Sequence, residues 1–498
     1  MNNLHSKIFL VSLFLTLMSS YGQSWVQLGN AIPGSSAYDY SSRDVSITSN
    51  GLRIAIGAER NDGNGTNSGQ VRVYEYFDTL GWYQIGYDIY GQGSSNYFGT
   101  SVSLSSDGSI VAIGAIMNYG SSPNTGYVQI YENTQTFNWV QKGGDILGTL
   151  DMDKFGSSIS LNADGTRVAI GATQEFGVHI GFVRVYDFDA INGWVQIGND
   201  IVGDAKFDEF GYSIMINDDG SRVIVGAPFN SSNGDNSGQA KVYELNNNEW
   251  IQLGEDFLGE NAEDELGYSI SINSDGSVIA IGAPQNDDNG LNAGQVKVYK
   301  YNNIDGWIQV GGDLNGVQHS RFGYAVSLDD VGNTLAVGAY LNSEIEPAAG
   351  KVKIYKYDET VGWTQWGQDI NGTSNSQLLG QAVALNSSGN TVVIGAQSSG
   401  ETTLQRGETS VFVFDETVNV RDFKKRKIAI YPNPTSGLIK INYPDKINKI
   451  QIYNELGQIL LSNIGEPEMD ISLLDRGLYF VKIFSENGQI QTKKVVKR

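Results

Sequence analysis

The sequence predicts an all-β protein in which seven repeated sheets form a ring and a small C-terminal β-sandwich follows. Three observations support this prediction. A tripeptide recurs at nearly constant spacing, each repeat holds short alternating or β-branched segments bounded by Gly, Asn and Asp, and the charge balance changes sign near residue 424. The 498 residues include 61 Gly but only 9 Pro, and 40% are apolar, so the chain is rich in turns and able to bury a core.

The repeated tripeptide is Ile-Gly-Ala or Val-Gly-Ala. Its glycines stand 57, 57, 55, 56, 56 and 57 residues apart, at Gly57, Gly114, Gly171, Gly226, Gly282, Gly338 and Gly395. One small sheet cannot bury both of its faces, whereas seven sheets packed around an axis bury these faces against one another. Because a period of about 50 residues is typical of propellers, we predict a seven-bladed β-propeller.

The fifth repeat illustrates the four strands expected in each blade. We place them at Leu266–Asn273, Ser277–Pro284, Gly294–Tyr301 and Trp307–Gly311. Asp275-Gly276 joins the first two, because this dipeptide tolerates the positive φ angles of a tight hairpin. One tryptophan per repeat opens the fourth strand, which predicts blade packing rather than a sugar platform. These tryptophans are Trp25, Trp82, Trp139, Trp194, Trp250, Trp307 and Trp363.

The two ends of the repeat region are out of phase. The strand that begins at Trp25 precedes the first complete repeat, while the last third strand, Val411 to Phe414, has no tryptophan strand after it. We therefore predict that Trp25–Gly29 pairs with Val411–Phe414. This pairing would close the ring and hide two sheet edges that otherwise invite aggregation.

The amino terminus has the pattern of a signal peptide. Lys7 precedes the apolar run Ile8 to Met18, and Ser20-Tyr21-Gly22 supplies the small residues of a cleavage site before Gln23. This apolar run is shorter than the 18 or so residues that a membrane helix needs. We predict a signal peptide at 1–22, the propeller at 23–414, a linker at 415–427 and the last domain at 428–498. The alternative for the first segment is a buried N-terminal helix.

The charge distribution separates the last domain from the propeller. Residues 424–498 contain 13 Lys+Arg and 7 Asp+Glu, a net of +6, which leaves 20 and 48, a net of -28, for residues 1–423. A strongly acidic body argues against nucleic-acid or anionic-membrane partners, since both need a basic face. The chain has no Cys and only His5, His179 and His319, so disulfides, thiolate sites and a multi-histidine zinc site are excluded.

Two further short motifs recur in the repeats. Phe-Gly occurs at Phe98-Gly99, Phe155-Gly156, Phe210-Gly211 and Phe322-Gly323, and Gly-Ala-Pro at Gly226–Pro228 and Gly282–Pro284. These motifs resemble FG-GAP repeats, which build the propeller of integrin α chains. The resemblance covers roughly residues 24 to 414 and implies the propeller fold. The first repeat departs from the pattern, because Ser41-Ser42 stands where Phe-Gly is expected.

The resemblance raises the question of calcium. In the integrin-like pattern, a loop of the form Asp-x-Asn-x-Asp-Gly-x-x-Asp before Gly-Ala-Pro clasps the ion with several oxygens. Here the stretch Asn273 to Ala280 is one residue shorter and lacks the final carboxylate. We therefore expect no metal site and no cofactor. Calcium remains a possible ligand that the repeat loops do not support.

The last segment contains a series of motifs in a fixed order. Their residues include Tyr431, Pro432, Asn433, Pro434, Gly437, Gly457, Gly477 and Tyr479. With these motifs the segment resembles the C-terminal sorting domain of the Bacteroidetes type IX secretion system. The resemblance implies the type IX machinery as a partner and a location at the outer-membrane surface or in the medium. The alternative is an ordinary adhesive sandwich.

Function is less well defined by the sequence. Propeller ligands bind on loop-bearing faces, and two sets of acidic loops are expected on one rim of the ring. We predict a binding or adhesion module for an extracellular glycan or protein, without assigned catalytic residues. The alternative function is a polysaccharide-acting glycosidase or lyase, and the alternative for the acids is a solvated surface. The candidate ligand-binding residues are Asp62, Asp208, Glu209, Asp264, Asp287 and Asp288.

Overall fold

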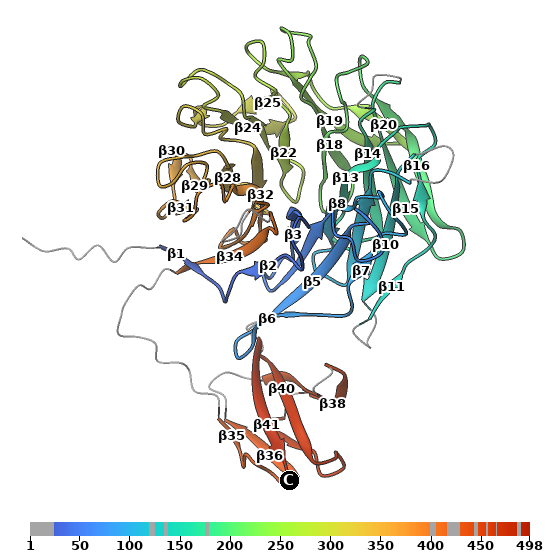
Figure 1. Ribbon diagram of the computed structural model, residues 1–498, viewed down its shortest axis with the longest axis vertical. Coiled ribbons are helices and arrows are strands. Elements are labelled where there is room, and N and C mark those ends of the chain that lie inside the picture. The colour runs from blue at the N-terminus through green and yellow to red at the C-terminus, as the bar shows by residue number, and fades with distance from the viewer. Residues whose placement is uncertain are drawn as a thin grey trace, which may run out of the picture.

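The computed structural model describes residues 24–118, 125–133, 138–174, 179–398, 405–415, 429–442, 447–454, 457–464, 466–485 and 490–498. Figure 1 shows a ring of sheets with a smaller β domain beside it. All elements of the described residues are strands, and no helix among them could cross a membrane. The predicted signal peptide and all but the first residue of the predicted linker lie outside the described residues.

Seven antiparallel sheets form the propeller, as the repeats predict. The first strand of each blade lies nearest the axis; these strands are β3 (Ser41–Ile47), β8 (Phe98–Leu104), β13 (Phe155–Leu161), β17 (Ser213–Ile216), β22 (Ser269–Ile272), β27 (Ala325–Leu328) and β32 (Leu379–Leu385). The second strands are β4 (Arg53–Ala58), β9 (Ile110–Ala115), β14 (Arg167–Ala172), β18 (Arg222–Ala227), β23 (Val278–Ala283), β28 (Thr334–Ala339) and β33 (Thr391–Ala396).

The outer half of each blade holds a third strand of seven or eight residues and an outermost strand that is short in every blade except the third. The third strands are β5 (Gln70–Phe77), β10 (Tyr127–Asn133), β15 (Phe182–Asp189), β19 (Gln239–Asn246), β24 (Gln295–Asn302), β29 (Lys351–Asp358) and β34 (Glu408–Asp415). The outermost strands, in blades one to seven, are β6 (Gly81–Gln84), β11 (Trp139–Gln141), β16 (Gly193–Val202), β20 (Glu249–Gln252), β25 (Gly306–Gln309), β30 (Gly362–Gln365) and β1 (Ser24–Gln27).

A fifth short strand was not expected from the sequence. In six blades it follows the outermost strand and pairs with the same third strand, whereas in blade three both pieces are the single strand β16. The outer edge is thus one interrupted strand rather than one short one. The six short strands are β2 (Ile32–Pro33), β7 (Ile89–Tyr90), β12 (Ile146–Leu147), β21 (Phe257–Leu258), β26 (Leu314–Asn315) and β31 (Ile370–Asn371).

The repeated glycines lie where neighbouring blades touch. A Cβ atom on Gly114 would stand 2.1 Å from the carbonyl oxygen of Gly156, the glycine of the next blade's Phe-Gly. The preceding Phe155 is fully buried between the two blades. The glycine of Ile-Gly-Ala and the glycine of Phe-Gly therefore recur because neighbouring blades pack too closely there for a side chain. The same contact recurs at Gly57, Gly171, Gly226, Gly282 and Gly338.

The seven tryptophans connect each blade to the one before it. Each indole Nε1–H donates to a backbone carbonyl in the outer edge of the preceding blade, which agrees with the predicted packing role. The donor and acceptor pairs, with N to O distances, are Trp82–Leu28 at 2.7 Å, Trp139–Ile85 at 3.1 Å, Trp194–Lys142 at 2.8 Å, Trp250–Ile197 at 3.3 Å, Trp307–Leu253 at 2.9 Å, Trp363–Val310 at 3.0 Å and Trp25–Trp366 at 2.8 Å.

The predicted ring closure is confirmed. β1 pairs antiparallel with β34, with Trp25 opposite Phe414 and Gln27 opposite Phe412. The innermost strands β32 and β3 also contact each other across the same junction. The first strand in the propeller sequence is therefore the outer strand of the last blade.

The last domain is a sandwich of two antiparallel sheets. One has the order β35 (Ala429–Tyr431), β36 (Leu438–Asn442), β39 (Glu468–Asp470), and the other β38 (Ile459–Ile464), β37 (Ile447–Tyr453), β40 (Gly477–Ser485), β41 (Ile490–Lys497). Ile439 of the first sheet and Ile450, Ile452, Val481 and Val495 of the second are fully buried between them. This core confirms the sandwich predicted from the sequence.

Candidate functional site

Two of the predicted rim acids hold the backbone of their own loops. Asp208 is buried and accepts hydrogen bonds from Ala205 N at 3.2 Å and from Asn230 Nδ2 at 2.7 Å. Asp264 is also buried and accepts from the backbone nitrogens of Glu260 and Asn261 at 3.0 and 2.8 Å. Burial raises the pKa of both carboxyl groups. Their oxygens are thus engaged in shaping the loops.

Three other predicted acids are exposed on the rim and also bond locally. Asp62 accepts from Asn67 N at 2.8 Å, Asp287 from Asn292 N at 2.6 Å and Asp288 from Gln295 Nε2 at 3.0 Å. Within the described ranges, no group of three or more His, Cys, Asp or Glu side chains is arranged to hold a metal ion. Asp264 and Asp288 lie near enough for the charge of Asp288 to help raise the pKa of Asp264. A ligand-binding role for these acids stays a prediction.

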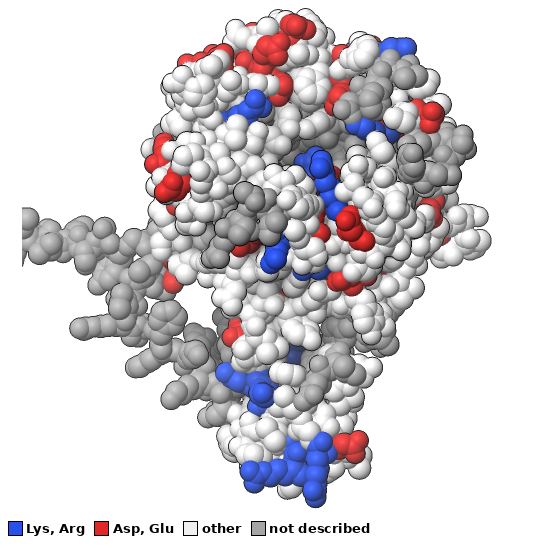
Figure 2. Space-filling model, in the orientation of Figure 1, with Lys and Arg blue, Asp and Glu red and all other residues white. Residues whose placement is uncertain are grey.

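Glu209, the sixth predicted residue, lies at the mouth of the central channel instead. The channel opens there into a cavity of about 450 Å³ that is lined by the inner strands of all seven blades. Figure 2 shows a hollow at the centre of the propeller face, with acidic and basic side chains beside it. This cavity is where the chain gathers side chains from every repeat.

The cavity is ringed by one residue from each blade. This residue directly follows the Phe-Gly position, so its side chain points toward the axis. It is tyrosine in three neighbouring blades and a different residue in each of the other four, so the ring is asymmetric. In chain order the ring consists of Arg43, Thr100, Ser157, Tyr212, Tyr268, Tyr324 and Gln381.

Three neighbouring blades supply an arc of tyrosines to this ring. The ring centroids of Tyr212 and Tyr268 are 4.9 Å apart and those of Tyr268 and Tyr324 are 4.8 Å apart. Tyr340 extends the arc, 4.2 Å from Tyr324. Burial raises the pKa of Tyr212 and Tyr268 well above the usual range, so their phenols stay neutral. The arc presents aromatic carbon together with hydroxyl groups.

Charged side chains occupy the rest of the mouth. Arg43 Nε lies 3.4 Å from Glu59 Oε2, and this carboxylate raises the pKa of the guanidinium further. Burial lowers the pKa of Lys154 and raises that of Glu209, while the two opposite charges partly offset this desolvation. Thr100 Oγ1 donates to Glu59 at 3.2 Å. The cavity thus combines cations and carboxylates with the tyrosine arc.

One carboxyl group that lines this cavity connects the inner strands of blades one and two. Asp44 occupies the position where four other blades have serine, and it accepts hydrogen bonds from Val45 N at 2.9 Å and Val102 N at 2.8 Å. Burial raises its pKa to about 6, although these two bonds oppose the shift. A carboxyl group that titrates near neutrality in a cavity is a feature of many functional sites.

Of this site, the sequence analysis identified only Glu209. The signal that could have revealed the site is the departure of the first repeat, where Ser41-Ser42-Arg43-Asp44 replaces the Phe-Gly-x-Ser of other repeats. A second signal is the unequal residue after each Phe-Gly. In the sequence alone, both signals look like ordinary divergence between repeats, because only the structure shows that these side chains face the same axis.

The motif residues of the last domain build its fold. Asn433 joins the first turn to the last strand, because its Nδ2 donates to Lys494 O at 2.7 Å and its Oδ1 accepts from Val496 N at 2.9 Å. Buried Tyr479 donates to Asp475 O at 2.8 Å. Gly457 has a φ of +77° in the turn before β38, which favours glycine. Pro432 and Pro434 flank Asn433, Gly437 precedes β36, and Gly477 begins β40.

Comparison with solved structures shows the propeller architecture. Kuenenia stuttgartiensis hydrazine synthase matches with a TM-score of 0.50 and 12% identity, over 78% of this chain and 98% of that one. A protein from Bacteroides uniformis, provisionally assigned as a 6-phosphogluconolactonase, matches with a TM-score of 0.45 and 12% identity, over 66% and 85% of the two chains. No curated protein sequence matches this chain.

Family comparison assigns both parts of the chain. Residues 429–498 match the secretion system C-terminal sorting domain, and residues 259–299 match the FG-GAP repeat. The sorting domain directs export through type IX secretion, so the protein is extracellular or attached to the outer membrane. The chain is therefore a β-propeller with a match to the FG-GAP repeat at residues 259–299, followed by a type IX C-terminal sorting domain at residues 429–498.

Proposed function

We propose that the protein is an exported binding module that holds an extracellular glycan in the mouth of its propeller channel. One observation carries the proposal: Tyr212, Tyr268 and Tyr324 line one cavity of about 450 Å³ together with the charged side chains of Arg43, Lys154 and Glu209. This volume lies within the roughly 300–1,000 Å³ typical of sites for small ligands. A module of this kind would serve attachment at the cell surface.

The chemistry of the cavity suits a sugar. The apolar C–H face of a pyranose ring packs on aromatic side chains such as Tyr268 and Tyr324, while its hydroxyls exchange hydrogen bonds with charged groups. Glu59 and Glu209 accept such bonds, and Arg43 and Lys154 donate them. A protein ligand would instead need a broad flat surface, typically about 800 Å² on each partner.

Binding to glycan and protein arrays tests the proposal. We expect the full-length protein to retain a defined set of glycans, and Tyr268→Ala to lose at least about tenfold in affinity, or about 1.4 kcal/mol. The matched comparison is Asp287→Asn, which alters an exposed rim acid and should leave affinity unchanged. Loss of binding in Asp287→Asn with retention in Tyr268→Ala would move the site to the rim. Retention of proteins alone would contradict the glycan proposal.

Asp44 favours cleavage of the bound glycan as a second function. Its pKa of about 6 lies in the range of a general acid, and Glu209 lines the same cavity as a second carboxyl group. A reducing-sugar assay on the glycans that bind distinguishes the two functions. Sugar release that disappears in Asp44→Asn while binding persists would establish an enzyme. The absence of release with wild-type protein would leave the binding module.

A further inference from the structure

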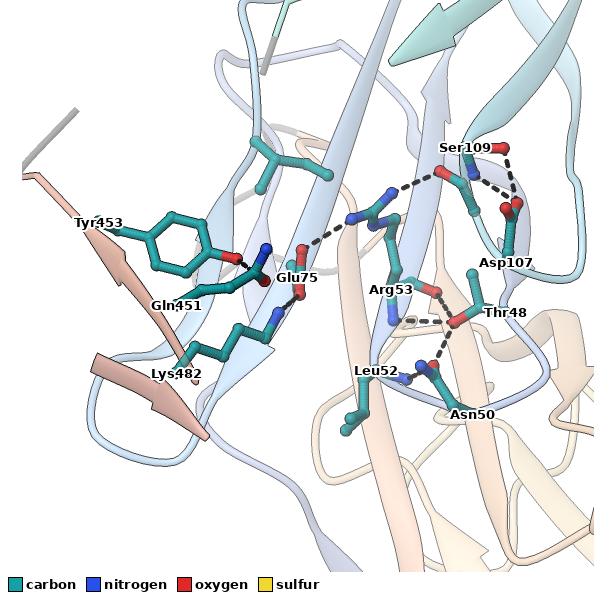
Figure 3. A network of polar contacts seen from close by, with 12 residues as sticks. Thr48, Asn50, Leu52, Arg53, Glu75, Asp107, Ser109, Gln451, Tyr453 and Lys482 are labelled. Atoms are coloured by element: carbon teal, nitrogen blue, oxygen red, sulfur yellow. Dashed lines mark hydrogen bonds and ion pairs between the residues drawn. The ribbon is translucent and has the colours of Figure 1, made fainter. Parts of the chain in front are cut away.

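The sorting domain contacts the outer part of blade one. Figure 3 shows Lys482 of β40 directed at Glu75 of β5. Lys482 Nζ donates to Glu75 Oε1 at 2.6 Å, and the two side chains are only 14% and 11% exposed. The pair therefore lies in a largely dry contact between the two domains.

Glu75 is held from the opposite side by its own blade. Arg53 of β4 donates from NH2 to Glu75 Oε2 at 2.8 Å and from NH1 to the carbonyl of Gly108, in blade two, at 2.6 Å. Burial opposes ionisation of Glu75, but Lys482 and Arg53 outweigh it and lower its pKa. One carboxylate is thus shared by a cation from each domain.

Blades three and four contain the same kind of arginine and acid pair, but there the acid is more exposed to solvent than in blade one. Arg167 pairs with Asp187 in blade three at 2.6 Å, and Arg222 pairs with Glu244 in blade four at 2.7 Å. Their acidic side chains are 39% and 40% exposed, against 11% for Glu75. The propeller fold alone therefore leaves this carboxylate open to solvent, and the sorting domain provides the burial in blade one.

Apolar groups surround the ion pair on both sides. Lys482 Nζ lies 5.4 Å from the ring centre of Phe77 in the propeller and 5.6 Å from that of Phe484 in its own domain. A cavity of about 180 Å³ beside it is lined by Tyr83 and Ile85 of the propeller and by Phe480 of the sorting domain. This void shows that the contact is less tightly packed than a protein core.

We propose that blade one is an intramolecular receptor for the sorting domain, with the Arg53-backed carboxylate of Glu75 as the recognition element for Lys482. The loose apolar surround makes the contact separable, and the desolvated ion pair fixes its orientation. The recognition element combines β4, β5 and a turn of blade two, so it exists only when these blades have folded. A folded propeller therefore holds its export domain in one orientation, and an unfolded one does not.

Distance measurement between spin labels tests this docking in the full chain. The protein has no Cys, so Ile191→Cys in the propeller and Leu473→Cys in the sorting domain, 91% and 98% exposed, give two specific label positions. We expect one narrow distance distribution for the otherwise wild-type protein. Lys482→Glu, which places a second carboxylate against Glu75, should lose the narrow peak, and Glu75→Gln should broaden it.

Control variants separate this recognition from general charge effects. Arg476→Glu makes the same kind of reversal at an exposed position of the sorting domain, and Glu244→Gln makes the same neutralisation in blade four. Both should keep the narrow peak, and an unchanged melting temperature in every variant shows that both domains stay folded. A broad distribution in wild-type protein, or a narrow one in Lys482→Glu, would overturn the proposal.

Discussion

The indole nitrogen of Trp25, in the first strand of the propeller sequence, donates to the carbonyl oxygen of Trp366 at 2.8 Å. Gln368 strengthens this junction, because its side chain accepts from Trp25 N at 2.9 Å and donates to Trp25 O at 2.8 Å. Trp25 is 3% exposed and packs edge-on against Phe414, 5.2 Å between ring centroids. The strand that closes the ring is thus fixed to two blades.

Removing Trp25 should destabilise the whole propeller. We expect Trp25→Ala to cost about 3–5 kcal/mol in the free energy of unfolding, as for other buried aromatic residues. Trp25→Phe keeps an aromatic ring but loses the Nε1 donor, and should cost about 1 kcal/mol for the bond itself. Denaturant unfolding measures both. If a shortened chain beginning at Asn30 melted at the same temperature as a chain beginning at Gln23, this role of Trp25 would be refuted.

The propeller could be predicted because its packing repeats. Gly114 and Trp139 have counterparts at fixed spacing, and each counterpart meets the same neighbour, so periodicity in sequence reports packing in space. The channel mouth could not be predicted in this way. Its chemistry depends on positions such as Arg43 and Tyr268 that differ between repeats, and their meeting depends on ring geometry rather than on local sequence.

Two other features depend on contacts that a local pattern does not contain. The fifth strands, such as Leu314–Asn315, are only two residues long and become strands because β24 extends beyond β25 to meet them. The pair of Glu75 and Lys482 joins two domains, and each residue by itself reads as an ordinary surface charge. Strand periodicity carries no information about either contact.

Stability should depend on pH through Asp44. Its pKa in the folded protein is about 6, above the ordinary value of 3.8, so the folded state binds the proton more tightly than the unfolded state. The free energy of unfolding therefore falls as the pH rises from about 4 to about 6, within the range set by these two values. Denaturant unfolding across this range should show the decline in wild-type protein and a smaller decline in Asp44→Asn.

Asp107 provides a comparison of opposite sign. Burial opposes its ionisation, but hydrogen bonds from Ser109 N and Ser109 Oγ, at 2.8 and 2.7 Å, outweigh this effect and lower its pKa. The stability that ionised Asp107 contributes to the folded protein is fully present above its ordinary pKa. This stability is lost as the pH falls through the lowered pKa of the folded state. Asp107→Asn should therefore reduce the loss of stability on acidification. Identical pH profiles for the two variants would contradict the assignment to Asp44.

Chelation should leave the melting temperature nearly unchanged. The hairpin carboxylate of Asp275 accepts from Ser277 N and Asn273 Nδ2, both at 2.9 Å, where the integrin-like loop would bind calcium. A site saturated at 100 times its dissociation constant would add about 2.7 kcal/mol. Calorimetric scans with and without a chelator measure this difference. A marked decrease would point to the rim acids, with Asp287→Asn and Asp288→Asn as the variants to follow.

Export should depend on the last domain. Deleting residues 424–498 should leave a folded propeller in the periplasm, and fusing these residues behind another exported protein should carry it outside. Figure 2 shows basic side chains on the end of the sorting domain away from the propeller.

We also predict cleavage near residues 424–427, outside the described residues. Mass spectrometry of the exterior fraction checks this, and stable recovery there of peptides ending at Arg498 would contradict it.

Closure of the ring by β1 also determines when certain contacts can form during synthesis of the chain. A chain is made from its amino terminus, so β1 emerges first, yet its partner β34 is the last propeller strand to appear. Until then Trp25 lacks Phe414 beside it, and before blade six has been made it also lacks the Trp366 carbonyl to bond. Contacts so distant in sequence form slowly. The ring can therefore close only after the last propeller strand, Glu408–Asp415, has been made, and a chain interrupted before Glu408 lacks the strand that would close it.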